Sequence, residues 1–237
     1  MIAEDAPVAE SASNLTAPKA PPGPKTNRAL ARVASAVVLL FAHAITAVRA
    51  KWEGVAPIDE QRIYFANHAS HGDFVLIWAV LPSRMRQQTR PVAGADYWLK
   101  SALRRFIGCD VFSAILIARD RLTQSENPIT QMVQALDDGS SLILFPEGTR
   151  NLSDAPLLPF KSGLYHLART RPDVSLVPTW IDNLNRVLPK GEVIPIPLIC
   201  TVTFGPPLRI GEGETKKAFL DRAEAALSAL SVKAPQT

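Results

Sequence analysis

The chain has 237 residues, of which 47% are hydrophobic, and it carries a formal net charge of +4 at pH 7. This length and apolar fraction predict one catalytic-size domain with a substantial core, and the mild positive charge favours an anionic partner such as a membrane or a phosphate. Basic tracts interleaved with aromatic residues, which single-strand binders use, are absent, so we expect no nucleic-acid partner.

The two cysteines, Cys109 and Cys200, are isolated among apolar residues. This arrangement excludes a disulfide framework and metal-ligand spacing, and it fits a reducing compartment. We expect two buried, unreactive thiols.

Residues 1–27 are rich in Ala, Pro, Ser and Asn, and we predict that they form a disordered tail. They do not have the pattern of a signal peptide, because a basic start is missing and the first apolar run comes too late.

Residues 28–52 are predicted to form a membrane-associating helix. As a helix, the apolar run from Val33 to Val48 would be about 24 Å long, against a hydrocarbon core of about 30 Å. A short or tilted span, a helix in the plane of the membrane and a helix packed on a soluble domain all remain open. Basic residues flank the run on both sides, so charge does not orient it; they are Arg28, Arg32, Arg49 and Lys51.

Residues 53–212 alternate between strand-like and helical patterns, which predicts an α/β domain with a mixed sheet flanked by helices. The expected strands are 63–66, 115–118, 141–145, 175–181 and 198–204, and the expected helices are 73–81, 128–137 and 162–169. A proline-punctuated loop follows at 189–197. Residues 213–237 are predicted to form a C-terminal helix over 214–230 and a short tail.

Residues 96–108 predict one amphipathic helix, because Lys100 and Arg104 are four residues apart and apolar residues lie between them. Such a helix suits anionic lipid headgroups, and it equally suits the surface of a soluble protein.

A histidine and a carboxylate lie in the turn between the strand at 63–66 and the following helix. On one helix, residues five apart point to different faces, so His68 and Asp73 can meet only if His68 precedes the helix and Asp73 lies in its first turn. Ser70 is the predicted N-cap. An aspartate that binds one imidazole nitrogen leaves the other free as a general base. The alternative is a capped helix with a solvated His and Asp.

A second polar turn follows the strand at 141–145. It offers the carboxylate of Glu147, the backbone of Gly148 for close approach, the hydroxyl of Thr149, and the guanidinium of Arg150 as a phosphate clamp. Ligand sites of α/β sheets gather at strand ends, which favours a binding site here. The alternative is a turn held by a Glu147–Arg150 ion pair.

Two further cations are candidates for the same phosphate. Arg119 ends the strand-like run at 115–118 and alternatively pairs with Asp120; Lys161 follows Arg150 by eleven residues and is alternatively solvated. His166 lies at helical spacing in an apolar stretch, which indicates a packed histidine.

Over about residues 55–210 these segments resemble the 1-acyl-sn-glycerol-3-phosphate acyltransferases, a family of glycerophospholipid acyltransferases. Asn67-His68-x-Ser70-x-x-Asp73 is similar to that family's His-x4-Asp motif, and residues 145–150 are similar to its FPEGTR motif. Residues 160–163 and 177–178 are similar to its later motifs. The family's second motif has a Gly a few residues before an Arg, whereas here Gly108 precedes Arg119 by eleven, so either an insertion lies between them or Arg119 is not the equivalent residue.

The resemblance implies an acyltransferase-like fold and transfer of a fatty acyl chain from a thioester donor, acyl-CoA or acyl carrier protein, to the hydroxyl of lysophosphatidate. It implies that His68 is the base and that Asp73 orients it. It further implies binding of the glycerophosphate by Glu147, Gly148, Thr149 and Arg150, with Arg119 and Lys161 as additional cations.

No metal or cofactor is expected. The resemblance also implies a membrane-associated protein with its catalytic domain on the cytoplasmic side. Three alternatives remain open: another lyso-lipid acceptor such as lyso-ornithine lipid, a non-catalytic lipid-binding module, and a soluble hydrolase of thioesters.

Overall fold

The computed structural model describes residues 28–118, 127–182 and 200–231. Their strands form one sheet in the order β1-β7-β6-β2-β5-β3-β4, in which all neighbours are parallel except β6 and β7. The predicted mixed sheet is therefore confirmed. The strands are β1 (Arg49–Trp52), β2 (Arg62–Ala66), β3 (Thr89–Gly94), β4 (Ile115–Ile117), β5 (Ser141–Leu144), β6 (Ser175–Asp182) and β7 (Thr201–Phe204).

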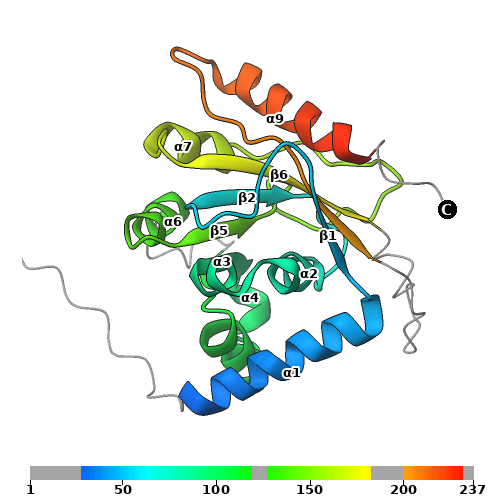
Figure 1. The fold of residues 1–237 in the computed structure, drawn as a ribbon. Helices are drawn as coiled ribbons and strands as arrows, with labels where there is room; N and C mark the ends of the chain where they lie inside the picture. Colours follow the sequence, from blue (N-terminus) through cyan, green and yellow to red (C-terminus); the bar gives the residue numbers. More distant parts are fainter. Residues whose placement is uncertain (1–27, 119–126, 183–199, 232–237) are drawn as a thin grey trace, which may run out of the picture.

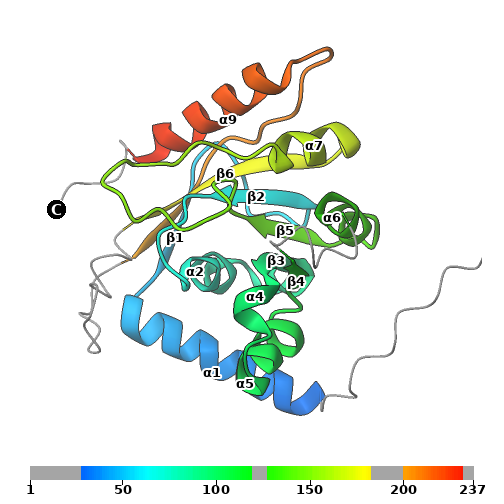
Figure 2. The same ribbon diagram turned by 180° about the vertical axis from the view of Figure 1, so that it is seen from behind.

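Helices cover both faces of the sheet (Figures 1 and 2). On one side of the sheet lie α2 (Asp73–Val80), α3 (Ser83–Gln88), α4 (Ala95–Trp98) and the π-helix η1 (Phe106–Val111). On this same side α1 (Arg28–Thr46) packs against α2 and η1, and α5 (Ala102–Arg105) packs against α4 and η1. The other face is covered by α6 (Pro128–Asp137), α7 (Gly163–Thr170) and α9 (Lys216–Ser231).

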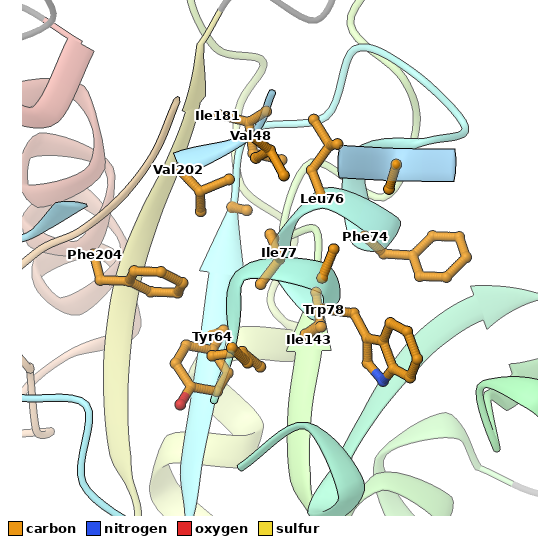
Figure 3. Close-up of a cluster of buried hydrophobic side chains, with 14 of the residues drawn as sticks. Val48, Tyr64, Phe74, Leu76, Ile77, Trp78, Ile143, Ile181, Val202 and Phe204 are labelled. Carbon is orange, nitrogen blue, oxygen red and sulfur yellow. The ribbon is translucent and has the colours of Figure 1, made fainter. Parts of the chain in front are cut away.

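The alternation of side chains along β2 explains the two-sided core. Tyr64 and Ala66 point into the cluster under α2, whereas Ile63 and Phe65 point into the cluster under α6, α7 and α9. All residues of β2 are buried, as expected for a central strand with both faces covered. Figure 3 shows the first cluster, in which Ile77 of α2 lies beside Tyr64 of β2 and Ile143 of β5.

Most of the predicted elements are present. The helix expected at 128–137 is α6 over the same residues, and the helices expected at 73–81, 162–169 and 214–230 are α2, α7 and α9 with shifted ends. The sheet also contains β1 and β3, which were not predicted. β3 includes Arg90 and Pro91, and β1 is a largely exposed strand with two cations, so neither has a strand-like apolar pattern.

The segment 28–52 is only partly helical. Helix α1 ends at Thr46, and residues 49–52 form β1, which pairs with β7. One side of α1 packs on the domain through Ala34, Val38, Leu39 and Ala42. Its other side exposes Leu30, Val33, Val37, Leu40 and Phe41. Among the described residues, no helix has both the length and the apolar content needed to cross a membrane.

The single helix predicted over 96–108 is wrong. The chain forms α4, α5 and η1 instead, and Ser101 caps α5 by accepting a hydrogen bond from the Arg104 amide at 3.3 Å. Trp98 folds back onto Gly108, where an added Cβ would lie 3.0 Å from the indole ring. A straight helix would separate these two residues by about 15 Å. The segment is therefore folded by packing of Trp98, which overrides the helical pattern.

Several predictions lie outside the described residues: the tail at 1–27, the position of Arg119, the proline-punctuated loop at 189–197, the first two residues of the strand expected at 198–204, and the C-terminal tail from residue 232. Of the two cysteines, Cys200 is buried as predicted, whereas Cys109 in η1 is only partly buried.

Candidate active site

His68 and Asp73 are in direct contact. Asp73 Oδ2 accepts a hydrogen bond from His68 Nδ1 at 2.8 Å, and Asp73 is the first residue of α2, as the spacing predicted. The Asp73 side chain is 2% exposed and the His68 side chain is 14% exposed. Because Nδ1 donates to the carboxylate, Nε2 is the free acceptor nitrogen of the ring. This is the arrangement of a general base.

The predicted N-cap is wrong. Gly72 is the N-cap of α2 and no side chain caps the helix; Ser70 Oγ instead accepts a hydrogen bond from the Gly72 amide at 3.2 Å. The Asp73 carboxylate organises the turn, because its Oδ2 also accepts from the amides of Ala69 at 2.7 Å and Ser70 at 2.9 Å. The negative side chain in the first helical turn is also favoured by the helix dipole.

Glu147 is buried between the two polar turns. Its Oε1 accepts a hydrogen bond from the His68 amide at 2.8 Å, and its Oε2 accepts one from the Leu158 amide at 2.8 Å. The residue is 1% exposed. Burial raises the pKa of the Glu147 carboxyl above its usual value, and the two amide hydrogen bonds oppose that rise. The alternative in which Glu147 pairs with Arg150 is not what the geometry shows.

The imidazole of His68 is also held by its neighbours. Its ring stacks on Phe145 with centroids 4.1 Å apart and planes inclined by 18°. The preceding residue, Asn67, extends the ladder between β2 and β6: its side chain donates to the Ile181 carbonyl at 3.0 Å and accepts from the Ile181 amide at 2.8 Å. The position of His68 is therefore fixed by β2, β5 and β6 together.

The second polar turn lies next to His68, because the amide of Asn151 donates to the His68 carbonyl at 2.6 Å. Gly148 has a φ of +70°, a left-handed conformation that favours glycine, and its added Cβ would lie 3.2 Å from Cγ of Lys161. Gly148, Thr149 and Lys161 are exposed and Arg150 is half-buried. The structure thus brings the turn that holds these predicted residues next to His68.

Two other histidines lie outside this arrangement. His166 was predicted to be packed, but it is exposed on α7. His71 is also exposed and stacks on Tyr97 with centroids 4.3 Å apart, while the guanidinium of Arg104 lies 4.5 Å from the centroid of the Tyr97 ring.

The protein-family comparison matches this part of the chain. The model of the family described as Acyltransferase matches residues 47–182, a span that contains both polar turns. The chain belongs to this acyltransferase family. The match begins immediately before β1 and ends with β6, so it covers the strands that hold His68 and Glu147.

Several curated members of the family are similar to this chain. A 1-acyl-sn-glycerol-3-phosphate acyltransferase of Limnanthes douglasii is 29% identical over 176 residues, which is 70% of this chain and 57% of that protein. One of Haemophilus influenzae is 31% identical over 129 residues, which is 50% of this chain and 48% of that protein. The chain thus spans about half the length of these curated relatives.

A solved structure has a related fold. The crystal structure of the 1-acyl-sn-glycerophosphate acyltransferase PlsC from Thermotoga maritima superimposes with a TM-score of 0.61 at 20% sequence identity, covering 90% of this chain and 86% of that one. At this identity the likeness establishes the fold.

The family motifs did not reveal how His68 is held. Asn67 and Phe145 both lie inside the motif segments, but neither a structural amide nor a stacking ring has a sequence signal of its own. Their partners are far away in the sequence: Asn67 bonds a residue 114 positions later.

Proposed function

We propose that the protein is an O-acyltransferase that moves a fatty acyl chain from a thioester to the free hydroxyl of lysophosphatidate, giving phosphatidate. The observation that carries this proposal is the His68–Asp73 contact, which leaves Nε2 free beside the turn that contains Arg150. The names of the similar proteins from Limnanthes douglasii and Haemophilus influenzae support the same acceptor.

In this mechanism, His68 Nε2 accepts the proton of the acceptor hydroxyl as its oxygen attacks the thioester carbonyl carbon. The new C–O bond forms, the C–S bond breaks, and the leaving thiolate takes the proton from the imidazolium. Asp73 stabilises the transient imidazolium through the Nδ1 hydrogen bond. A positioned base of this kind contributes about 10²–10⁴-fold to the rate. No covalent enzyme intermediate and no cofactor enter this scheme, and acyl-CoA or acyl carrier protein is the donor.

The acceptor phosphate is assigned to the exposed side of the second polar turn. Arg150 offers a bidentate clamp, Lys161 adds a second positive charge, and Gly148 and Thr149 offer backbone and hydroxyl donors. Arg119 stays a predicted member of this site.

The proposal also includes a membrane surface as partner. The exposed residues of α1 recur at intervals of three and four, which places them on one stripe opposite the packed side of the helix. We assign α1 to the plane of the bilayer surface, with this stripe in the lipid and the catalytic domain on the cytoplasmic side, where thioester donors are made. The exposed Leu99 and Leu103, beside Lys100 and Arg105, extend the same surface.

The membrane assignment is tested by vesicle co-sedimentation of the full chain with anionic phospholipid. Leu40 is 73% exposed, so Leu40→Glu should weaken vesicle binding strongly without loss of folding. Ile58→Glu is the matched control, because Ile58 is 49% exposed but lies in a loop away from α1. Equal vesicle binding by both variants would show that α1 does not contact the membrane.

The catalytic proposal is tested with the purified full chain, a panel of acyl-CoA and acyl carrier protein donors, and a panel of acceptors. We expect acyl transfer to lysophosphatidate that is abolished in His68→Ala. Transfer to a phosphate-free acceptor such as lyso-ornithine lipid, with none to lysophosphatidate, would show that the acceptor is another lyso-lipid. Thiol release that does not depend on any acceptor would indicate a hydrolase, and a fully active His68→Ala variant would exclude this mechanism.

A further inference from the structure

Glu147 lies in the motif that the family resemblance assigns to acceptor binding, yet its carboxylate faces the protein interior. We propose that Glu147 is a positioning residue for His68 and does not contact the acceptor. This inference rests on the proposed acyl transfer, because it assigns a role within the same site. It predicts that Glu147 acts on turnover, whereas its motif neighbour Arg150 acts on acceptor affinity.

Both carboxylate oxygens of Glu147 are engaged by backbone amides, at 2.8 Å each, and the residue is 1% exposed. An acceptor hydroxyl would have to reach a side chain that solvent does not reach. Gly148 and Thr149, the next residues in the motif, are exposed. The motif therefore divides into an inward-facing acid and an outward-facing binding turn.

The inward-facing part holds His68 through both of its backbone polar groups. The His68 amide donates to Glu147, and the His68 carbonyl accepts from the Asn151 amide. The ring itself stacks on Phe145. These three contacts come from one stretch of seven residues, 145–151, so the second motif fixes the main chain and the ring plane of the base. A displacement of about 1 Å in a reacting group costs roughly 10²-fold in rate.

The second oxygen of Glu147 links the same site to the segment that carries Lys161. It accepts from the Leu158 amide, and the Lys161 amide donates to the Pro146 carbonyl at 2.7 Å. Glu147 therefore ties three pieces of chain together: the loop of the base, the polar turn, and the 157–161 segment.

The decisive variant is Glu147→Gln. A glutamine carbonyl accepts from one of the two amides, but its NH₂ group then faces the other amide donor, so one hydrogen bond is lost. We expect kcat to fall by about 10- to 100-fold, while KM values for the acceptor and the donor stay within about twofold. A raised acceptor KM with unchanged kcat would show that Glu147 contacts the acceptor and would overturn the proposal.

Ser141→Ala is the matched control. Ser141 Oγ accepts from the Arg62 amide at 3.0 Å, so it is also a buried link from β5 to a backbone amide of the β2 segment, at the end of β2 far from His68. Glu147 to His68 and Ser141 to Arg62 span the same sequence separation of 79 residues. We expect a similar loss of melting temperature in Ser141→Ala, with kcat unchanged. An equal fall of kcat in this control would show that general loosening of the two strands is responsible, and the proposal would fail.

Amide hydrogen exchange provides a readout that needs no activity. The glutamine keeps only one of the two amide hydrogen bonds, so exchange should be faster in Glu147→Gln than in the parent protein at the amide that loses its acceptor, His68 or Leu158. Exchange at both amides should be unchanged in Ser141→Ala. If Glu147→Gln does not fold, Glu147→Asp takes its place: it keeps the charge and both acceptor oxygens on a side chain one methylene shorter, and it should show the same kinetic pattern in weaker form. Unchanged exchange at both the His68 and the Leu158 amides overturns the positioning role, whereas inactivity of the parent protein on every acceptor counts against the proposed function alone.

Discussion

Asp73→Asn separates the charge of the carboxylate from its shape. The asparagine carbonyl oxygen can take the place of Oδ2 and accept the hydrogen bonds now made by His68 Nδ1 and by the amides of Ala69 and Ser70. His68 then keeps its tautomer and its place in the turn. The variant loses the negative charge that, in the proposed mechanism, stabilises the imidazolium formed during proton transfer.

The size of the effect follows from the contact distance. Nδ1 and Oδ2 are 2.8 Å apart, and the Asp73 side chain is 2% exposed. Two unit charges about 4 Å apart interact with about 4 kcal/mol at an effective dielectric constant of about 20. Because about 1.36 kcal/mol corresponds to a factor of ten in rate, we expect kcat to fall about 10³-fold. The three hydrogen bonds become neutral ones, which costs the fold about 1 kcal/mol each.

The assay is acceptor-dependent release of thiol from acyl-CoA, with the melting temperature measured in parallel. Asp154→Asn is the control, because it makes the same chemical change at an exposed position after the second polar turn. It should leave both kcat and stability unchanged. A kcat for Asp73→Asn within tenfold of the parent protein, with folding intact, would refute the assignment of Asp73 as the partner that stabilises the imidazolium.

Further predictions concern groups around this pair. His71→Ala should keep kcat within about tenfold of the parent value, because His71 is exposed and stacks on Tyr97. A loss of kcat as large as that of Asp73→Asn would contradict the assignment of His68 as the general base. Arg150→Ala should raise the KM for lysophosphatidate about 10- to 100-fold and leave the KM for the donor unchanged, because the variant loses a charge-assisted phosphate contact. An unchanged acceptor KM would show that Arg150 does not bind the phosphate. Burial raises the pKa of the Cys200 thiol to about 11, so thiol reagents at pH 8 should not modify Cys200 in the folded protein, and modification should follow unfolding or a pH near 11. Rapid native labelling at Cys200, mapped by mass spectrometry, would contradict its burial.

The parts of the fold that the sequence predicted are those in which local pattern and tertiary packing agree. β2 is a short apolar run with both faces covered, and α6 begins at an Asn127 cap followed by Pro128. The same agreement gave the His68–Asp73 contact, because the geometry of a strand-to-helix turn is local. β1 and β3 lie toward the edges of the sheet and have cations or proline in their interiors, so their strand state depends on neighbours that no local pattern reveals.

The candidate site was predictable as a set of residues but not as a network. The motif suggested that Glu147 would face the acceptor, whereas its carboxylate lies buried against the amides of His68 and Leu158. The direction in which a side chain points from a turn is set by the long-range contacts around it. Here Gly148 has a positive φ immediately after Glu147, and the motif changes at that point from a buried residue to the exposed Gly148 and Thr149.

The two buried acids connect the folding of the loop with the proposed chemistry. Three successive amides, those of His68, Ala69 and Ser70, donate to carboxylates: the first to Glu147 and the next two to Asp73. Burial of two like charges near each other is unfavourable, and these backbone donors compensate for the lost solvation. The imidazole contacts the Asp73 carboxylate, and the charge of His68 opposes the rise in the pKa of Glu147. In the proposed mechanism a positive charge forms on His68, whose Nδ1 lies 2.8 Å from Oδ2 of Asp73. Proton transfer to Nε2 would create this charge, so in the proposed mechanism the Asp73 carboxylate that shapes the loop also stabilises the imidazolium.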